Sequence, residues 1–111
     1  MNFNEYQDLA TRTANQNMSV DQELCNWAMG LCGEAGEYTD EIKKHVFHKK
    51  PLNVTNCLKE LGDVLWYVAQ CARTLNVSLE QIAQENIQKL KARYPEGFTE
   101  GGGVRRSALS D

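Results

Sequence analysis

The sequence predicts an all-α protein built as a bundle of four helices. Apolar residues recur at helical spacing in four separate segments of the 111-residue chain, and no segment shows the period-two alternation of a strand. These segments also begin or end at residues that favour a helix terminus. A chain of this length fits one compact domain, which we expect over residues 1–98, followed by a flexible Gly-rich tail over 99–111.

The expected helix boundaries follow from capping residues. The expected ranges are 4–15, 19–46, 53–76 and 78–94. Ser19 is followed three residues later by Gln22, a pattern typical of a capping box at a helix N-terminus. We expect Asn53 to cap the third helix and Pro95 to end the fourth, because the residue before a proline avoids the α region. The expected apolar seam of the third helix is Leu58, Leu61, Leu65, Val68, Ala72 and Leu75.

Composition and charge exclude several classes of function. The net charge of −3 provides no basic field that would attract a nucleic-acid polymer or an anionic membrane. No stretch approaches the roughly 18 apolar residues of a membrane span, and the first residues lack the pattern of a signal peptide. The four cysteines form no CxxC pair and lie in apolar helical patterns, so we expect buried, reduced thiols. We therefore expect a cytoplasmic protein.

Four carboxylates stand in two pairs, and each pair is three residues apart on a predicted helix. Glu34 and Glu37 fall about 60° apart on a helical wheel, at one edge of the apolar stripe and next to Glu41. Like charges at this spacing repel one another. The third helix, which carries Glu60 and Asp63, is apolar around most of its circumference and should be buried by several neighbours. Carboxylates in such a place need a cation.

The nature of this cation follows from the ligand atoms. An all-oxygen set favours Mg²⁺, with Mn²⁺ as an alternative, over zinc. Glycines beside the acidic pairs, at Gly33, Gly36 and Gly62, indicate a close approach of the two helices that would bring the carboxylates together. We interpret His45 and His48 as surface or substrate-proximal residues and not as ligands. The alternative is that Glu34 and Glu37 are surface acids and that Glu60 and Asp63 pair with lysines of a neighbouring helix.

Three stretches of the sequence resemble the MazG-type nucleoside triphosphate pyrophosphohydrolases. They are Gly-Leu-Cys-Gly-Glu-Ala-Gly-Glu (30–37), Lys-Glu-Leu-Gly-Asp-Val-Leu-Trp-Tyr (59–67) and Asn-Ile-Gln-Lys-Leu-Lys-Ala-Arg-Tyr-Pro-Glu-Gly-Phe (86–98). Together they form the ordered ExxE, spacer and ExxD pattern of that family, with its N-x-x-K-x-x-x-R-Y-P ending. The resemblance implies a helical domain that assembles as a homodimer or a homotetramer (a dimer of dimers). It also implies Mg²⁺ held by Glu34, Glu37, Glu60 and Asp63.

The resemblance further implies hydrolysis of (deoxy)nucleoside triphosphates to the monophosphate and pyrophosphate, which we expect to serve housecleaning of the nucleotide pool. We interpret Glu37 as the carboxylate that orients the attacking water. Lys89 and Arg93 share one face of the fourth helix and can contact phosphate oxygens. Trp27 is as typical of a core position as of a base contact, whereas Trp66 is expected to widen an apolar surface for self-association. The predicted substrate-binding residues are Asn26, Trp27, Tyr67, Asn86, Lys89 and Arg93.

Two other functions stay open at this point. The chain can be a non-catalytic helical multimerisation module, in which case protein cations pair with the acids and no divalent metal is required. It can also be a phosphoribosyl-nucleotide pyrophosphohydrolase, because those enzymes share this helical metal-binding arrangement. The N-x-x-K-x-x-x-R-Y-P stretch favours the MazG-type function over the latter.

Overall fold

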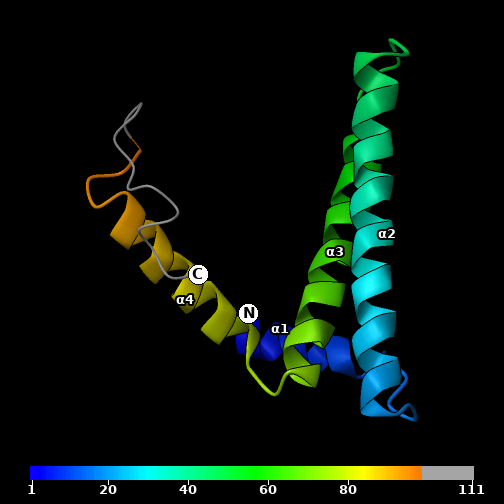
Figure 1. Cartoon of the computed structure of the whole chain (residues 1–111). Helices are drawn as coiled ribbons and strands as arrows, with labels where there is room; N and C mark the ends of the chain where they lie inside the picture. Colours follow the sequence, from blue (N-terminus) through cyan, green and yellow to red (C-terminus); the bar gives the residue numbers. More distant parts are fainter. Residues whose placement is uncertain (99–111) are drawn as a thin grey trace. The chain divides into compact units, whose positions relative to one another are not determined.

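The computed structural model describes residues 1–98 and confirms the all-α prediction (Figure 1). Its four helices are α1 (Phe3–Thr11), α2 (Val20–Val46), α3 (Val54–Thr74) and α4 (Leu79–Arg93). No strand occurs between residues 1 and 98. In the same span, no helix is both long and apolar enough to cross a membrane.

Helix α1 is shorter than predicted. It begins with a capping box, in which the Asn2 side chain accepts a hydrogen bond from the Glu5 backbone N–H. Its C-terminal end falls at Thr11 instead of Asn15. The reason is local: the backbone N–H and the hydroxyl of Thr13 both donate to the Ala10 carbonyl, which tightens the chain into a turn.

Helices α2 and α3 begin at the predicted caps. Ser19 accepts from the Gln22 N–H while the Gln22 side chain accepts from the Ser19 N–H, so the predicted capping box is confirmed. Asn53 caps α3 by accepting from the Asn56 N–H at 3.0 Å. At the other end of α3, Asn76 adopts a left-handed φ of 62°, and the N–H of Val77 donates to the Ala72 carbonyl. This is a Schellman termination, in which Asn replaces the usual glycine.

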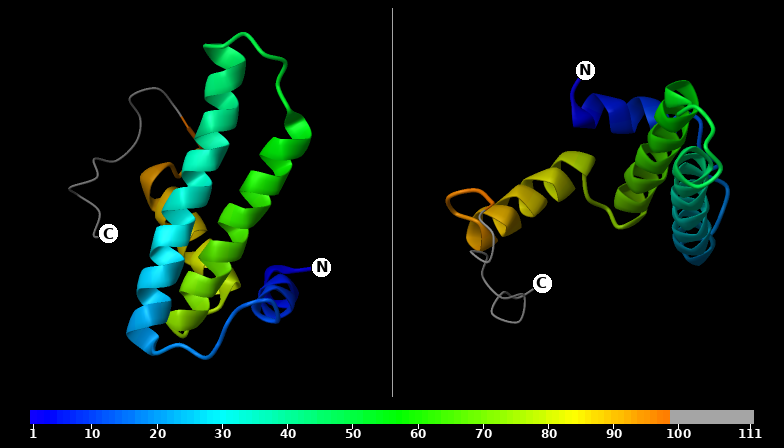
Figure 2. Two further views of the ribbon diagram at one scale, coloured as in Figure 1. Left: turned by 90° about the vertical axis from the view of Figure 1, so that its right-hand side faces the viewer. Right: turned by 90° about the horizontal axis from the view of Figure 1, so that it is seen from above.

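The chain divides into two compact units, one from Met1 to Leu79 and one from Glu80 onward. In the first unit, α2 and α3 run antiparallel along each other and α1 crosses the C-terminal part of α3 (Figures 1 and 2). In the second unit, α4 ends at Arg93, directly before Tyr94 and Pro95 as predicted, and the rings of Tyr94 and Phe98 lie 5.9 Å apart. A single domain over 1–98 stays a prediction. The predicted tail at 99–111 lies outside the described residues.

Polar side chains hold the core of the first unit together. Gln7 of α1 donates to the Ala69 carbonyl of α3 at 3.1 Å and accepts from the Leu79 N–H at 3.0 Å. Arg73 of α3 forms a partly buried ion pair with Glu23 of α2. These bonds join the helices where small residues leave little apolar area to bury.

The glycines beside the acidic pairs do not have the predicted role. A Cβ built at Gly33, Gly36 or Gly62 meets no atom within 4 Å, so none of the three allows a close helix approach. That role belongs to Gly30, where a Cβ would stand 2.1 Å from Cε1 of the Tyr67 ring. The α2–α3 contact is therefore closest one turn before the first acidic residue.

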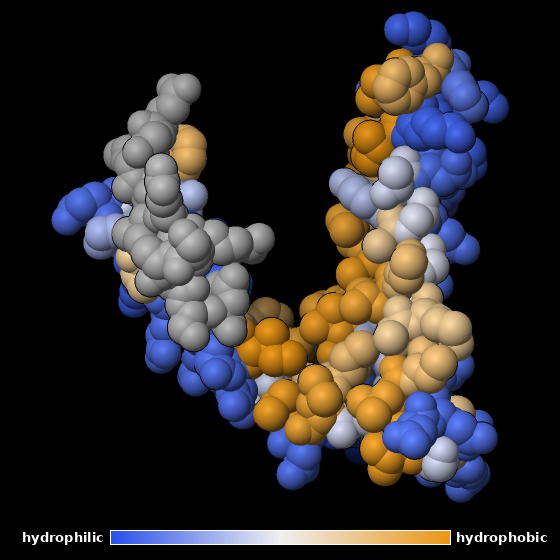
Figure 3. Space-filling view, viewed as in Figure 1, coloured by the Kyte–Doolittle hydropathy of each residue, from blue (hydrophilic) through white to orange (hydrophobic). Residues whose placement is uncertain are grey.

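Three of the six residues of the predicted α3 seam are exposed, whereas Ala72 is fully buried. Leu58, Leu61 and Leu75 have 65%, 45% and 63% of their surface exposed, and Figure 3 shows apolar residues along the α3 side of the hairpin. Trp66 is partly buried within the unit, and its predicted part in self-association stays a prediction. Its ring packs in a T shape on Trp27 at 5.4 Å, and its indole N–H donates to the Thr13 hydroxyl. The first unit alone therefore leaves much of its apolar surface in contact with water.

The cysteines follow the prediction only in part. All four are free thiols, but Cys25 and Cys32 are exposed. Cys57 is buried and Cys71 is partly buried. The apolar pattern of α2 predicted that Cys25 and Cys32 are buried. They are exposed because one side of α2 has no neighbouring helix in this unit.

Candidate metal centre

Three carboxylates from two helices converge in the first unit. Glu34 and Glu37 lie one turn apart on α2, and Glu60 faces them from α3. One oxygen atom of each lies within 4.8 Å of the other two. The antiparallel α2–α3 hairpin produces this convergence, because it sets the C-terminal half of α2 beside the N-terminal half of α3.

Within the first unit, no protein cation pairs with the cluster. One oxygen of Glu34 and one of Glu60 are buried and have no hydrogen-bond partner. Among the described residues of this unit, no lysine or arginine forms an ion pair with any of the three acids, whereas Lys44 pairs with Asp40 and Glu41. Unpartnered buried carboxylate oxygens are costly. Within the first unit, the three acids therefore lack the lysine partners that the alternative requires.

The mutual approach of the acids changes their proton affinity. The pKa of Glu60 rises from 4.5 to about 7, first because its carboxyl lies within hydrogen-bonding reach of Glu37 and Glu34, then through desolvation and their negative charges. For Glu34, a proton shared with Glu60 lowers the pKa. Desolvation and the charges of Glu37 and Asp63 outweigh this effect and leave the pKa raised. Repulsion of this kind is relieved by a proton or by a bound cation.

A divalent metal ion fits this arrangement. The donor atoms are all carboxylate oxygens, which suit Mg²⁺ or Mn²⁺. They come from two rigid helices, and two of the oxygens have no other partner. Glu34, Glu37 and Glu60 are therefore the residues that would hold the ion.

Asp63, the fourth predicted ligand, stands at the edge of this cluster. It follows Glu60 by one turn of α3 and is exposed, but the three converging oxygen atoms do not include one of its own. Its charge nevertheless acts on Glu34, and it contributes, after burial, to the raised pKa of Tyr6. Its place among the ligands stays a prediction.

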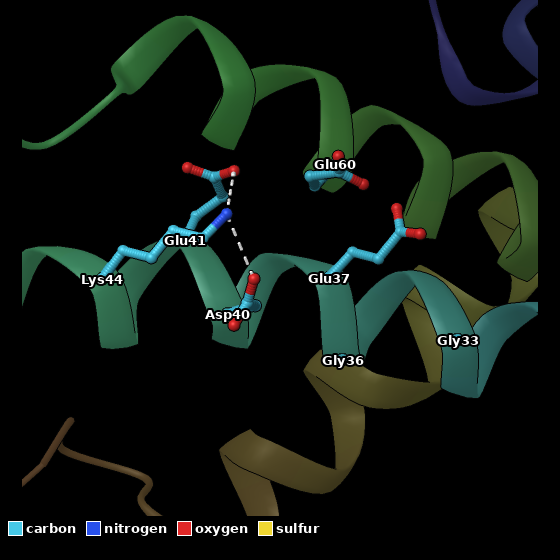
Figure 4. A pocket seen from close by; sticks show the side chains of 7 residues that line it. All are labelled: Gly33, Gly36, Glu37, Asp40, Glu41, Lys44 and Glu60. Atoms are coloured by element: carbon cyan, nitrogen blue, oxygen red, sulfur yellow. Dashed lines mark ion pairs between the residues drawn. The ribbon is translucent and has the colours of Figure 1, made fainter.

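A pocket of about 450 Å³ opens beside the cluster (Figure 4). Glu37 and Glu60 contribute one part of its wall, and Lys44 contributes the only basic side chain among its lining residues. Lys44 is not among the predicted site residues, because a lysine near the end of a helix is usually a plain surface charge. The full lining is Gly33, Gly36, Glu37, Asp40, Glu41, Lys44 and Glu60.

The predicted substrate contacts of the first unit lie in different environments. Trp27 is only 3% exposed and packs against Trp66 and Tyr67, which favours its alternative role as a core residue. Its indole N–H is buried without a hydrogen-bond partner. Tyr67 is partly buried against Gly30. Asn26 is exposed and lines a separate shallow pocket on α2 together with Met18, Gln22, Cys25 and Met29.

The three predicted substrate-binding residues of α4 share one face of that helix. Asn86, Lys89 and Arg93 fall within about 60° of one another on the helical wheel. The Nε and Nη2 atoms of Arg93 are buried and have no hydrogen-bond partner. These residues belong to the second unit, so their approach to the carboxylates stays a prediction.

The helical hairpin with three converging carboxylates places the chain among all-α proteins with a candidate site for a divalent metal ion. Within this class, residues 22–98 match the family model of the MazG nucleotide pyrophosphohydrolase domain. The chain is also 43% identical over 82 residues to the Gene 37 protein of Mycobacterium phage L5, covering 70% of this chain and 72% of the phage protein. No solved structure matches it. The chain belongs to the MazG nucleotide pyrophosphohydrolase family.

Proposed function

We propose that this protein is a Mg²⁺-dependent pyrophosphohydrolase that cleaves (deoxy)nucleoside triphosphates to the monophosphate and pyrophosphate, with Mn²⁺ as an alternative ion. The observation that carries the proposal is the cluster of Glu34, Glu37 and Glu60, whose oxygens converge within 4.8 Å. The MazG domain supports the reaction class. Housecleaning of the nucleotide pool is the role that we propose for this activity.

Each acid has a proposed task. Glu34, Glu60 and Asp63 would hold the metal ion together with Glu37, and the bound ion would neutralise charge on the phosphate oxygens. Glu37 is the exposed member of the converging three, so it can be reached by water as well. We assign Glu37 to orient the attacking water and to accept its proton, as the water oxygen bonds to the α-phosphorus.

Side chains outside the cluster would bind the rest of the substrate. Lys89 and Arg93 of α4 are suited to phosphate oxygens, and the unsatisfied guanidinium nitrogens of Arg93 support this role. Asn86 lies on the same face. Asn26 has an exposed amide that can contact a base or sugar, whereas the burial of Trp27 supports a structural role.

Self-association is part of the proposal. The exposed leucines of α3 and the small core of the first unit support a homodimer or homotetramer, because a second copy can cover this apolar surface. The same exposed surface also favours one alternative, a non-catalytic multimerisation module. That alternative requires no divalent metal.

The test is to incubate the purified full chain with a panel of canonical and modified nucleoside triphosphates, with Mg²⁺ or with EDTA. We expect metal-dependent release of pyrophosphate and the monophosphate. Glu37→Gln should lower kcat by at least about 100-fold, whereas Asp21→Asn, which removes an equivalent charge at the start of α2, should leave it unchanged. Release of orthophosphate instead would contradict attack at the α-phosphorus. No turnover of any substrate would favour the multimerisation module.

A further inference from the structure

The pocket beside the carboxylate cluster is lined by four carboxylates and one lysine. At one end lie Glu37 and Glu60, which belong to the candidate metal centre, and at the other lies Lys44 (Figure 4). Gly33 and Gly36 line the pocket on the side of Glu37 away from Lys44 and present no side chain, whereas Asp40 and Glu41 lie between Glu37 and Lys44 (Figure 4). A Cβ at either glycine would meet nothing within 4 Å, so packing does not require glycine there. The bare helix surface leaves room for a ligand beside the cluster.

Lys44 faces the same side of α2 as Glu37. Seven residues make almost two helical turns, so Lys44 is rotated from Glu37 by only about 20° and lies about 10 Å farther along the axis. Side chains on a helix lean toward its N-terminus, which directs the Lys44 ammonium back toward the cluster. The ammonium is therefore separated from the candidate metal centre by the length of the pocket.

Two carboxylates hold the ammonium in this position. The Lys44 Nζ atom lies 3.2 Å from Asp40 Oδ2 and 4.0 Å from Glu41 Oε1. Glu41 in turn accepts a hydrogen bond from Asn56 Nδ2 of α3 at 3.4 Å. These contacts tie the lysine to both helices, although 46% of its side chain stays exposed to the solvent and to a ligand.

The proposed reaction creates a need for such a cation. When the water oxygen bonds to the α-phosphorus, the bond from that phosphorus to the oxygen bridging to the β-phosphorus breaks. The electron pair stays on the bridging oxygen, and pyrophosphate leaves with an additional negative charge. A leaving group of this charge beside a cluster of acids requires compensation beyond the metal ion itself.

We propose that Lys44 binds the β- and γ-phosphates of the substrate and stabilises the leaving pyrophosphate in the pocket lined by Glu37, Glu60 and Lys44. This inference rests on the proposed function and assigns a residue that the predicted site did not include. The alternative is that Lys44 makes only a surface ion pair with Asp40, four residues earlier on the same helix, which contributes little.

The direct test is calorimetric titration of the full-length protein with inorganic pyrophosphate in the presence of Mg²⁺. We expect Lys44→Gln to weaken pyrophosphate binding by about 10- to 100-fold, the range for loss of a charge-assisted contact. Lys44→Arg should keep most of the affinity. The matched control is Lys43→Gln, which removes the same charge one residue earlier, from a position that does not line the pocket. Its affinity should stay within about twofold of the wild type.

Binding of Mg²⁺ alone separates a phosphate contact from damage to the metal centre. Lys44→Gln should bind Mg²⁺ at least as well as the wild type, because it loses a positive charge near the cluster. Weakened Mg²⁺ binding by this variant would overturn the proposal. Equal pyrophosphate affinity of the wild type and Lys44→Gln, an equal loss in Lys43→Gln, or no binding by the wild type would also overturn it.

These outcomes are independent of the proposed function. If the wild type hydrolyses nucleoside triphosphates but Lys44→Gln binds pyrophosphate normally, only the role of Lys44 fails. If the wild type binds pyrophosphate through Lys44 but hydrolyses no triphosphate, the pocket stands as an anion site and the proposed function fails.

Discussion

The ring of Tyr67 lies directly over Gly30, so close that a Cβ on the glycine would stand 2.1 Å from Cε1 of the ring. This approach joins α2 to α3 one turn before Glu34. It also fixes the side of α3 from which Glu60 faces the cluster, because Tyr67 and Glu60 are two turns apart on that helix.

Gly30→Ala should therefore destabilise the protein. Alanine gains about 1 kcal/mol of helix propensity over glycine, but the displaced ring should cost about 1–3 kcal/mol or more, as in overpacked cores. Gly33→Ala is the matched control: its Cβ meets no atom within 4 Å, so it should raise stability. Thermal unfolding of the metal-free variants measures both effects. Equal melting temperatures for the two variants would contradict the predicted contact.

The helix boundaries could be predicted because their causes are local. The capping box of Ser19 and Gln22, the Asn53 cap and the stop before Pro95 each depend on a few consecutive residues. The acidic pairs could be predicted for the same reason, since spacing along one helix places Glu34 next to Glu37. The early end of α1 escaped prediction because the hydroxyl of Thr13 competes for the Ala10 carbonyl.

Tertiary relationships were harder to predict, because they depend on which faces meet. A helical wheel places Trp66 on an apolar side of α3. It cannot show that the folded chain brings Thr13 and Ala10 within hydrogen-bonding distance of the Trp66 indole N–H. The wheel also cannot distinguish Gly30, which lies under the Tyr67 ring, from Gly33 and Gly36, which line the pocket. From the sequence, Lys44 is equally consistent with a phosphate contact and with a plain surface charge. The choice depends on which residues of another helix line the same pocket.

The raised pKa values in the cluster predict an unusual pH dependence. In the metal-free fold Glu60 keeps its proton up to about pH 7, whereas the unfolded chain releases it near its ordinary pKa of 4.5. The stabilising contribution is therefore complete below pH 4.5 and is lost as the pH rises through about 7. Glu34, whose pKa is also raised, acts in the same direction. In EDTA, the melting temperature should fall across this range.

Mg²⁺ should reverse this trend, because the ion binds deprotonated carboxylates and its affinity rises over the same pH range. Thermal unfolding of the wild type and Glu60→Gln, with EDTA and with Mg²⁺, measures both effects. The substitution should reduce the pH slope in EDTA and remove most of the stabilisation by Mg²⁺. In EDTA, the melting temperature of the wild type should fall relative to that of Glu60→Gln as the pH rises to 7. A rise instead would contradict the coupling of the three acids.

Gln7 should be the most sensitive polar residue of the first unit. It donates to the Ala69 carbonyl and accepts from the Leu79 N–H, and it is 9% exposed. Gln7→Leu keeps a similar volume but leaves the Leu79 N–H without its partner, while the Ala69 carbonyl keeps only its bond within α3. The unfolding free energy should therefore fall by about 1–3 kcal/mol. Urea unfolding measures this loss. The control is Gln22→Leu at an exposed position, which removes only the reciprocal bond of a capping box and should cost less.

The exposed seam of α3 provides the final prediction, which concerns self-association. Leu58 exposes 65% of its surface in the N-terminal half of α3, and Leu61, three residues later, exposes 45%. If a second copy covers this face, Leu58→Glu places an unpaired charge in the interface and should shift the assembly toward smaller species, by at least about 100-fold in the dissociation constant. Sedimentation equilibrium measures the shift. The control is Lys59→Glu, which introduces a carboxylate at the next residue. That residue faces about 100° away on the helix, so Lys59→Glu should associate much more strongly than Leu58→Glu. A wild type that stays monomeric at high concentration would exclude a subunit contact. Equal association by both variants would place that contact away from Leu58.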